Sequence, residues 1–581
     1  MSLAMRGLIA AAALSWLPAC PVDGEPDGGS GGAAAKTPDP EGLDSADAGP
    51  SGEPGPSDDA GPSDDAGNAS PSGVRLSGVA VAQGVTVTLM TTSEPEPPPA
   101  PDDTPGEPFG GRCLEDADCQ EGLICGTLTY TCAERCMGFS GQSCAEVGCC
   151  PISEAEECNL LGFCAGDYGL LGNPGGPRPD AFGTPLLGDR PGRVRVFVAG
   201  VSQPSEVTAR VLVSGVEHVV TKTLRGDSVE ANDRTTLDID LDTTSFTGDA
   251  IEVTVRLEDA TGVLDTFGPA SLPLMASRPL RVGLVPVRYQ FGGVDLTPDV
   301  SAQQLEVYRA RLFAQMPVRS VELEVLAELV WDQQIVDRAG LSALLGAIME
   351  RRSLDGPDDN VFYYGLVNAT ATTEEFRQLG MPAGLGMRPD APDPALQVAV
   401  GWGFSGSESA DIAVHELGHN LGRKHVDCGG PEGIDPDYPY PTDDLGVFGF
   451  DVMEARVIPR GYFSDVMSYC FPGWPSDYTF QAMAERLRLI QSASGFALAR
   501  PRVWHDVIIE SERGLSHGSR VRRARGLPGG HEVLHVVTPA GVVELSVPVV
   551  DTGHGDVRFY FIERWPEGAT AVKRGTHTLA L

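Results

Sequence analysis

Basic residues are scarce in this chain. Lysine and arginine number 42 against 81 aspartates and glutamates, so the formal net charge of the 581 residues is −39. Such a surface would repel a nucleic acid, because phosphates carry the same sign of charge. The composition therefore argues against a nucleic-acid partner. At 61.2 kDa the chain is also larger than a single hydrophobic core usually supports, so several domains are expected.

The N-terminus lacks an apolar run long enough to cross a bilayer. Arg6 precedes the apolar stretch Leu8–Leu17, whose length is typical of a signal peptide. The next residues, Leu17-Pro18-Ala19-Cys20, resemble a bacterial lipoprotein box, although Pro18 is unusual there. Residues 1–20 therefore predict export, either as a cell-surface lipoprotein anchored at Cys20 or as a cleaved, secreted and extracellular protein.

Basic and large apolar residues are rare in the next segment as well. Residues 21–109 hold seventeen acidic residues against two basic ones, and the hexapeptide Gly-Pro-Ser-Asp-Asp-Ala occurs at 55–60 and again at 61–66. A chain of this composition buries too little apolar surface to fold. We expect a disordered acidic linker over 21–73 and a proline-rich linker over 94–112.

Ten of the thirteen cysteines lie between Cys113 and Cys164. They stand among glycines and polar residues, with few large apolar side chains, which indicates a small disulfide-rich module over 113–165 held by up to five bridges. A metal cluster would need Cys-x-x-Cys pairs, whereas spacings such as Cys113-x5-Cys119 occur here. The other three cysteines are Cys20, Cys428 and Cys470.

The run from His415 to His425 reads HELGHNLGRKH and predicts a zinc site. On a helix, His415 and His419 share a face, and Glu416 lies beside them, free to act on a metal-bound water. Gly422 can adopt positive φ, end the helix and bring His425 back as a third ligand. Three protein ligands leave the fourth position open, which is typical of a catalytic site.

The same short pattern occurs again from His531 to His535, where we predict no metal site. It follows two glycines and opens an alternating run with Val533 and Val537, which is typical of a strand. Histidines four apart on a strand lie about 13 Å from each other, too far to hold one zinc. This second match serves as an internal control for the first.

Together with Ser464–Cys470, the extended motif resembles the metzincin metallopeptidases. Met467 matches the methionine that in metzincins passes beneath the zinc, and Tyr469 matches a tyrosine that in some members can ligate the metal and stabilise the transition state. Val426, after the third histidine, departs from the familiar subfamilies. The resemblance covers roughly residues 280–498 and leaves the subfamily open.

The resemblance implies a zinc endopeptidase acting on proteins or glycoproteins. Zinc would activate water and polarise the scissile carbonyl, Glu416 would act as general base, and Tyr469 would help to stabilise the oxyanion. A buried structural tyrosine is the alternative for Tyr469.

Hydrophobic periodicity predicts the elements of this region. Alternating or apolar runs indicate strands and 3.6-residue periodicity indicates helices, and their alternation is typical of an α/β layer. Expected strands are 281–289, 361–367 and 397–402, and expected helices are 303–316 and 339–351. The motif helix should begin a few residues before His415, with Ser407 or Ser409 as its cap.

The fold expected is multidomain. An α/β metzincin-like zinc protease domain (278–498) is flanked by β-sandwich-like domains, with the disulfide module and the disordered linker as additions. One sandwich is formed by 74–93 and 187–276, so that the cysteine module is inserted in it, although two unrelated segments would also fit. A strand-rich domain over 501–581 either binds a ligand or only stabilises the chain.

Two further sites lie close to the motif. Cys428 follows the last zinc histidine by three residues and Cys470 follows Met467 by three, so a bridge between them would tie the two halves of the site together. Acidic residues fill the connection between these halves: Asp435, Asp437, Asp443, Asp444 and Asp451. A calcium site there is weakly supported, because no recognised calcium-loop spacing is present.

The competing hypothesis is a surface adhesin without enzymatic activity, in which the zinc domain is a relic. Such a relic would be free to lose Glu416 while keeping its histidines, yet every catalytic position is intact. The sequence leaves substrate preference and the oligomeric state open. No thiol-switch propeptide is evident, so the means of latency is open as well.

Overall fold

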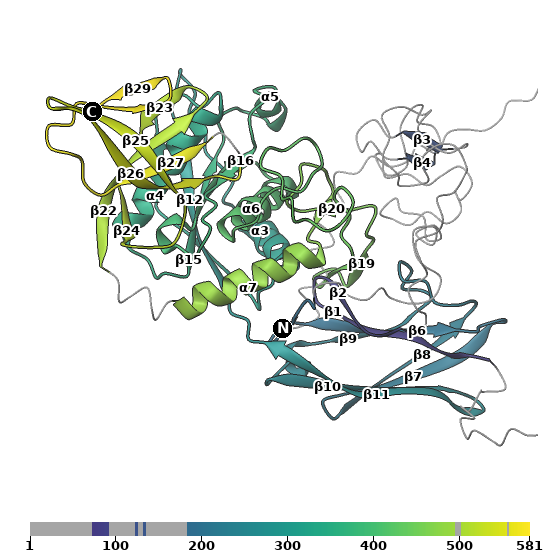
Figure 1. The fold of residues 1–581 in the computed structure, drawn as a ribbon. Coiled ribbons are helices and arrows are strands. Elements are labelled where there is room, and N and C mark those ends of the chain that lie inside the picture. The colour runs from purple at the N-terminus through teal and green to yellow at the C-terminus, as the bar shows by residue number, and fades with distance from the viewer. Residues whose placement is uncertain (1–72, 92–122, 126–131, 135–182, 494–500, 555–556) are drawn as a thin grey trace, which may run out of the picture. The chain divides into compact units, whose positions relative to one another are not determined.

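A computed structural model describes residues 73–91, 123–125, 132–134, 183–493, 501–554 and 557–581 (Figure 1). The described residues are rich in β-strand, form several sheets and include five α-helices, which confirms a multidomain, β-rich architecture. The predicted signal peptide, the anchor at Cys20, the linkers other than residue 73 and most of the cysteine module lie outside these residues. Within the module, two short strands pair antiparallel: β3 (Leu123–Cys125) and β4 (Cys132–Glu134).

Two antiparallel-rich sheets enclose the first hydrophobic core. One has the strand order β2-β1-β6-β9 and the other β5-β11-β10-β7-β8. Their bounds are β1 Arg75–Ala82, β2 Thr86–Thr91, β5 Leu186–Leu187, β6 Gly192–Ala199, β7 Ser205–Val213, β8 Val216–Leu224, β9 Leu237–Leu241, β10 Ala250–Asp259 and β11 Gly262–Met275. Strand β1 pairs antiparallel with β6, so strands from before and after the cysteine module are neighbours.

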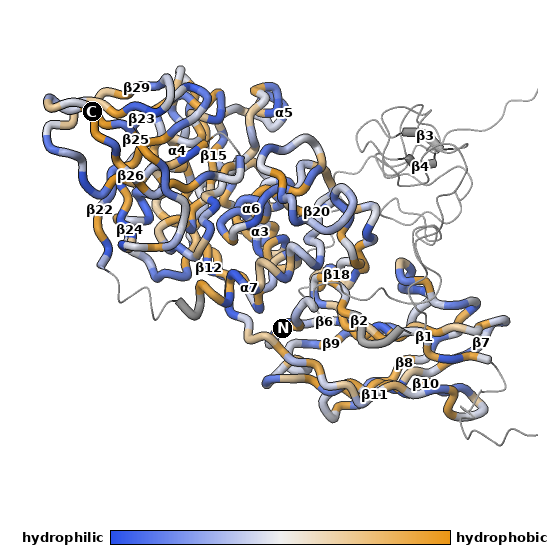
Figure 2. The backbone as a smooth tube through the Cα atoms, in the orientation of Figure 1, coloured by the Kyte–Doolittle hydropathy of each residue, from blue (hydrophilic) through white to orange (hydrophobic). Residues whose placement is uncertain are grey.

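Alternation along the strands explains why the two sheets pack together. In β7 the buried residues recur at every second position, and hydrophobic and hydrophilic residues alternate along the strands of this part in Figure 2. Val79 and Val196 of one sheet join Val211 and Val253 of the other in a single buried cluster. Burial on one face of each sheet is what an alternating pattern requires.

The predicted α/β layer is present. Its sheet has the order β13-β12-β15-β17-β16, with β14 also paired to β12. All pairs are parallel except that of β16 with β17. The strands are β12 Leu280–Tyr289, β13 Val321–Val325, β14 Leu329–Trp331, β15 Val361–Val367, β16 Gly384–Gly386 and β17 Val398–Trp402. The helices are α3 Ala302–Gln315, α4 Arg338–Asp355, α5 Thr373–Arg377, α6 Ser407–Asn420 and α7 Asp477–Ala493. The predicted strands and helices of this layer are thereby confirmed to within a few residues.

Short strand pairs follow α6. They are β18 (Gly449–Asp451) with β19 (Arg456–Ile458), and β20 (Ser464–Asp465) with β21 (Gly473–Trp474). The C-terminal part is an eight-stranded sheet with the order β23-β22-β27-β26-β25-β28-β29 and β24 paired to β22. Its strands are β22 Arg502–Ser511, β23 Gly514–His517, β24 Val521–Ala524, β25 His531–Thr538, β26 Gly541–Asp551, β27 Arg558–Ile562, β28 Ala571–Arg574 and β29 His577–Ala580.

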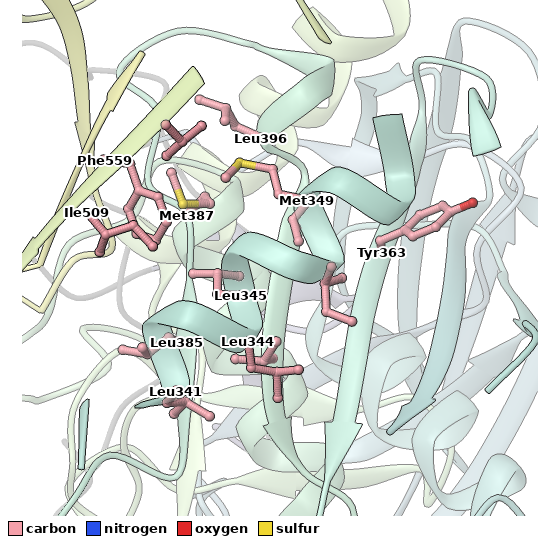
Figure 3. Close-up of a cluster of buried hydrophobic side chains, with 14 of the residues drawn as sticks. Leu341, Leu344, Leu345, Met349, Tyr363, Leu385, Met387, Leu396, Ile509 and Phe559 are labelled. Carbon is pink, nitrogen blue, oxygen red and sulfur yellow. The ribbon is translucent and has the colours of Figure 1, made fainter. Parts of the chain in front are cut away.

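This C-terminal sheet shares a core with the α/β layer. Helix α4 is buried on several faces, with Leu341, Leu345 and Met349 among its buried residues. Figure 3 shows these side chains in one buried cluster with Leu385 and Met387 of the α/β layer and with Ile509 and Phe559 of the C-terminal sheet. A helix apolar on most of its surface requires cover on both sides. The C-terminal strands are therefore packed onto the α/β layer through α4.

Candidate metal centre

Helix α6 carries the first part of the motif. Its N-cap is Gly406, which makes no side-chain cap bond, so the expected cap at Ser407 or Ser409 is wrong. The Ser409 hydroxyl instead donates to the carbonyl oxygen of Phe404. The end of the helix is tied to the sheet, because the buried Asn420 amide donates to the carbonyl oxygens of Met387 and Val398 at 2.8 and 2.9 Å.

Gly422 turns the chain after the helix. Its φ of 81° lies in the left-handed region that favours glycine, and its N–H donates to the carbonyl oxygen of His419. The turn brings His425 back beside the helix. The ligand nitrogens of His415, His419 and His425 all lie within 4.8 Å of one another, and the three side chains are buried.

The three rings are held so that one nitrogen of each faces the common centre. Every Nδ1 meets a backbone carbonyl oxygen: His415 that of Val466 at 2.8 Å, His419 that of Arg423 at 2.8 Å, and His425 that of Glu432. Metal-bound histidines are oriented in this way, because the Nδ1–H donates outward and Nε2 is left for the metal. The Nε2 atoms of His419 and His425 are 3.1 Å apart, and that of His415 has no partner among the described residues.

Burial keeps these imidazoles neutral, as metal ligands must be. It lowers the pKa of His415 to about 4 and that of His425 to about 3, and it lowers the pKa of His419 well below its usual value. Three converging neutral nitrogens with an orphaned, buried Nε2 fit a divalent metal such as zinc. The chain thus contains a buried three-histidine cluster that could hold a metal.

Glu416 lies on the same helix and is 3% exposed. Burial raises the pKa of its carboxyl group well above the usual range, partly offset by a hydrogen bond from the backbone of Gly386. Its Oε2 has no hydrogen-bond partner among the described residues. Oxygen and nitrogen ligand atoms of Glu416, His419 and His554 also lie within 4.8 Å of one another. The carboxyl group of Glu416 is thus close to the histidine cluster without being one of its three members.

Met467 is fully buried beside α6, in the same core as Leu417 and Leu421 of that helix. A turn holds it there, since the N–H of Met467 donates to Oδ1 of Asp465 and that of Ser468 donates to the carbonyl oxygen of Asp465. The N–H of Val426 then donates to the carbonyl oxygen of Met467. The segment after the third histidine is thereby joined to the segment that carries the methionine.

Cys428 and Cys470 form a disulfide, with their Cα atoms 5.7 Å apart. The predicted bridge is confirmed. The N–H of Tyr469 also donates to the carbonyl oxygen of Cys428 at 3.0 Å. Covalent and hydrogen-bonded links therefore reinforce each other next to the histidine cluster.

The sequence analysis missed His554, which is 2% exposed and follows strand β26. Its Nδ1 lies 2.8 Å from the hydroxyl of Tyr469, the residue expected to act near the metal. No short motif contains His554, and its place depends on contacts with residues more than eighty positions earlier. The one local signal is a Gly-His pair immediately after a strand, which is weak.

The aspartates considered for calcium have other partners. Asp435 accepts from Arg423 and from the hydroxyl of Tyr478, both at 3.1 Å. Asp444 accepts from the N–H of Gly446, and Asp451 from that of Met453. Over the described ranges, these carboxylates do not converge in a group of three or more. The described carboxylates of this connection thus have partners within the protein, and a calcium site there stays a prediction.

The second match to the short motif forms strand β25, as predicted. His531 and His535 are both exposed, and Glu532 pairs with Arg574. Among the described residues, neither histidine belongs to a group that could hold a metal. The control and the candidate site therefore differ in structure despite sharing a pattern.

Comparison with known proteins gives no family for this chain. No family model and no curated protein matches the sequence. Similar solved structures include a chaperone–substrate complex (TM-score 0.20, 11% identity, covering 44% of this chain and 39% of that one). Another is a beta-galactosidase candidate from Bacteroides fragilis (TM-score 0.12, 12% identity, covering 30% and 36%). The chain spans well under half the length of each, and the scores are too low to support an argument about fold.

Proposed function

We propose that this protein is a metzincin-like zinc endopeptidase. The supporting observation is the histidine cluster on α6 and the turn after it, with Nδ1 of each ring held by a carbonyl oxygen and Glu416 adjacent. Zinc held by His415, His419 and His425 would serve as a Lewis acid for water and for the scissile carbonyl. No family match supports the assignment, so it depends on the motif and on the arrangement of the site.

Glu416 is the general base in this proposal. Its carboxylate accepts a proton from the attacking water and returns it to the leaving amine. The position of its side chain supports this role, because Oε2 has no hydrogen-bond partner among the described residues and the carboxyl group lies near His419. Tyr469 is positioned to donate a hydrogen bond to the oxyanion once its hydroxyl is free of His554.

Export also belongs to the proposal. The apolar stretch before Cys20 and the acidic linker are the features that support it, and a disulfide beside the site suits an oxidising compartment. Among the described residues, no helix combines the length and the apolar character needed to cross a bilayer. We propose a secreted or surface-anchored enzyme whose substrates are proteins or glycoproteins.

The test is the metal content and the peptidase activity of the purified, oxidised chain. We expect about one zinc per chain, slow internal cleavage of an unfolded protein and loss of activity with a chelator. Glu416→Gln should keep the zinc and lose activity by about 10²–10⁴-fold, because the water loses its base. Glu532→Gln is the matched control. A chain that binds no zinc, or a Glu416→Gln variant with full activity, would favour the adhesin hypothesis.

A further inference from the structure

Four residues of the C-terminal sheet lie against the histidine cluster. This closing segment, Asp551–His554, begins at the last residue of strand β26. Gly553 has a φ of 78°, and a Cβ atom placed on it would lie 2.5 Å from Cε1 of His419. Only glycine allows the backbone to approach the ring so closely. The segment is therefore built to touch a metal-binding histidine.

The ring of His554 packs against two of the three proposed ligands. Its centroid is 4.9 Å from that of His425 and 5.5 Å from that of His419. The ligands themselves are separated by 4.6 to 5.2 Å between centroids. A ligand nitrogen of His554 also lies within 4.8 Å of ligand atoms of His419 and Glu416. Its ring spacing from His425 and His419 is thus close to the spacing within the triad.

His554 also has the hydrogen-bond arrangement of a ligand. Its Nδ1 is paired with the oxygen of Tyr469, as the other three rings are paired through Nδ1 with carbonyl oxygens. Its Nε2 is buried and has no partner among the described residues. A buried polar nitrogen without a partner is destabilising, so an unpaired Nε2 calls for an explanation. A metal held jointly with the triad would supply its missing partner.

The closing segment is fixed at its start. Asp551 accepts two hydrogen bonds from the guanidinium of Arg388, at 2.9 and 2.6 Å, and the N–H of Arg388 donates to the carbonyl oxygen of Asp551. Arg388 follows the edge strand β16, so the segment covers one end of that edge. Val550 and Phe559, on either side of the segment, are in the core shared with α4. The contact is thus anchored by charge and by packing.

The centre is enclosed. His415, the most exposed of the four histidines, is only 9% accessible, and Glu416 is 3% accessible. The closing segment adds to this cover, because Gly553 lies against His419 and His554 lies against Tyr469.

We propose that His554 is the fourth protein ligand of the metal and that the chain, as folded, is a closed, latent form of the enzyme. A zinc site with four protein ligands has no position for water, which is the difference between a structural and a catalytic site. The inference rests on the proposed function and adds its regulation. Activity then requires release of the closing segment, so the C-terminal sheet is an inhibitory element supplied by the same chain.

The first test uses the cobalt-substituted full chain and acetohydroxamate, a small chelating probe that needs an open coordination position. In the wild type we expect no change of the cobalt absorption spectrum at millimolar probe. His554→Ala should bind the probe and change its spectrum. It should also hold the metal more weakly by at least about tenfold in chelator competition, as even indirect supports of a ligand are worth 10–100-fold. His531→Ala, an exposed strand histidine, is the control and should behave as the wild type.

Two further variants displace the closing segment and keep His554. Gly553→Ala introduces a methyl group against His419, and Asp551→Asn weakens the pair with Arg388. Both should admit the probe, Gly553→Ala more strongly. Turnover should rise at least about tenfold in His554→Ala, because the active fraction of a mostly closed population limits the rate.

The outcomes separate this inference from the proposed function. If the chain binds neither cobalt nor zinc, the metal centre itself is wrong. If it binds metal but the wild type takes up acetohydroxamate as readily as His554→Ala, the site is open and the latency inference is overturned. It is equally overturned if His554→Ala lowers turnover with unchanged probe binding, since His554 would then assist the reaction alongside Tyr469.

Discussion

Two segments of this protein contain the pattern His-Glu-x-x-His, and they differ in secondary structure and in burial. On α6, His415 and His419 are buried and share a face toward His425. On β25, His531 and His535 are exposed, on a strand whose rise sets them about 13 Å apart. The pattern is therefore informative only through the secondary structure that carries it. A glycine turn and a third histidine distinguish the copy that we propose to bind the metal.

The largest expected effect comes from removing each pair of histidines. His415→Ala with His419→Ala should abolish metal binding, because only one ligand of the triad is left. His531→Ala with His535→Ala should leave metal content and turnover unchanged. Metal analysis of dialysed protein measures both. Loss of one zinc per chain in the variant of the strand histidines would contradict the conclusion that β25 binds no metal.

The disulfide supports the helical copy and has no counterpart at β25 in the described residues. Cys428→Ser with Cys470→Ser reopens a loop of 42 residues, which the chain-entropy model values at about 4 kcal/mol of stability. We expect a lower unfolding temperature and weaker zinc binding. Calorimetry and chelator competition check this, with non-reducing peptide mapping of the wild type as the reference. Equal melting temperatures would show that the bridge is dispensable.

A smaller effect is expected at the end of α6. Asn420→Ala removes two hydrogen bonds and leaves the carbonyl oxygens of Met387 and Val398 buried without this donor. The cost should be about 2–3 kcal/mol, measured by chemical denaturation. Asn420→Asp is the matched variant of similar size, and it should be at least as destabilising because it buries a charge beside two carbonyl oxygens. A neutral result for both would mean that packing alone holds the helix to the sheet.

The smallest effect is expected from the glutamate of the strand copy. Glu532 pairs with Arg574 and accepts from the hydroxyl of Tyr560, and both members of the ion pair are partly exposed. Glu532→Gln should therefore cost no more than about 0.5–1 kcal/mol and leave turnover intact. A loss of activity like that of Glu416→Gln would contradict the division of roles between the two segments.

Local signals in the sequence predict part of this structure well. The triad is encoded within eleven residues, because helical spacing and one positive φ at Gly422 are enough to gather three histidines. Alternating residues likewise predicted the strands around it. The caps at Ser407 and Ser409 failed because the preceding glycine turn places Gly406 at the helix start, where no side chain is available.

Contacts distant in sequence could not be predicted in this way. His554 reaches the cluster because Asp551, the last residue of β26, pairs with Arg388. No local sequence pattern specifies this pairing. The core shared by α4 and the C-terminal strands has a local signal, since the consecutive residues Leu344, Leu345 and Gly346 are all buried and therefore face more than one side of the helix. An all-round apolar helix predicts cover by two layers, though not which strands supply the second one.

The core shared by α4 and the C-terminal strands also limits how early α4 can complete its packing during synthesis. Helix α4 is made some two hundred residues before β27, yet Phe559 is needed to cover it. Such distant contacts carry a large loop-closure cost and form late. Helix α4 therefore cannot reach its final packing until the last strands have emerged. The segment Asp551–His554 precedes β27, so it has already been made by the time this shared core is complete.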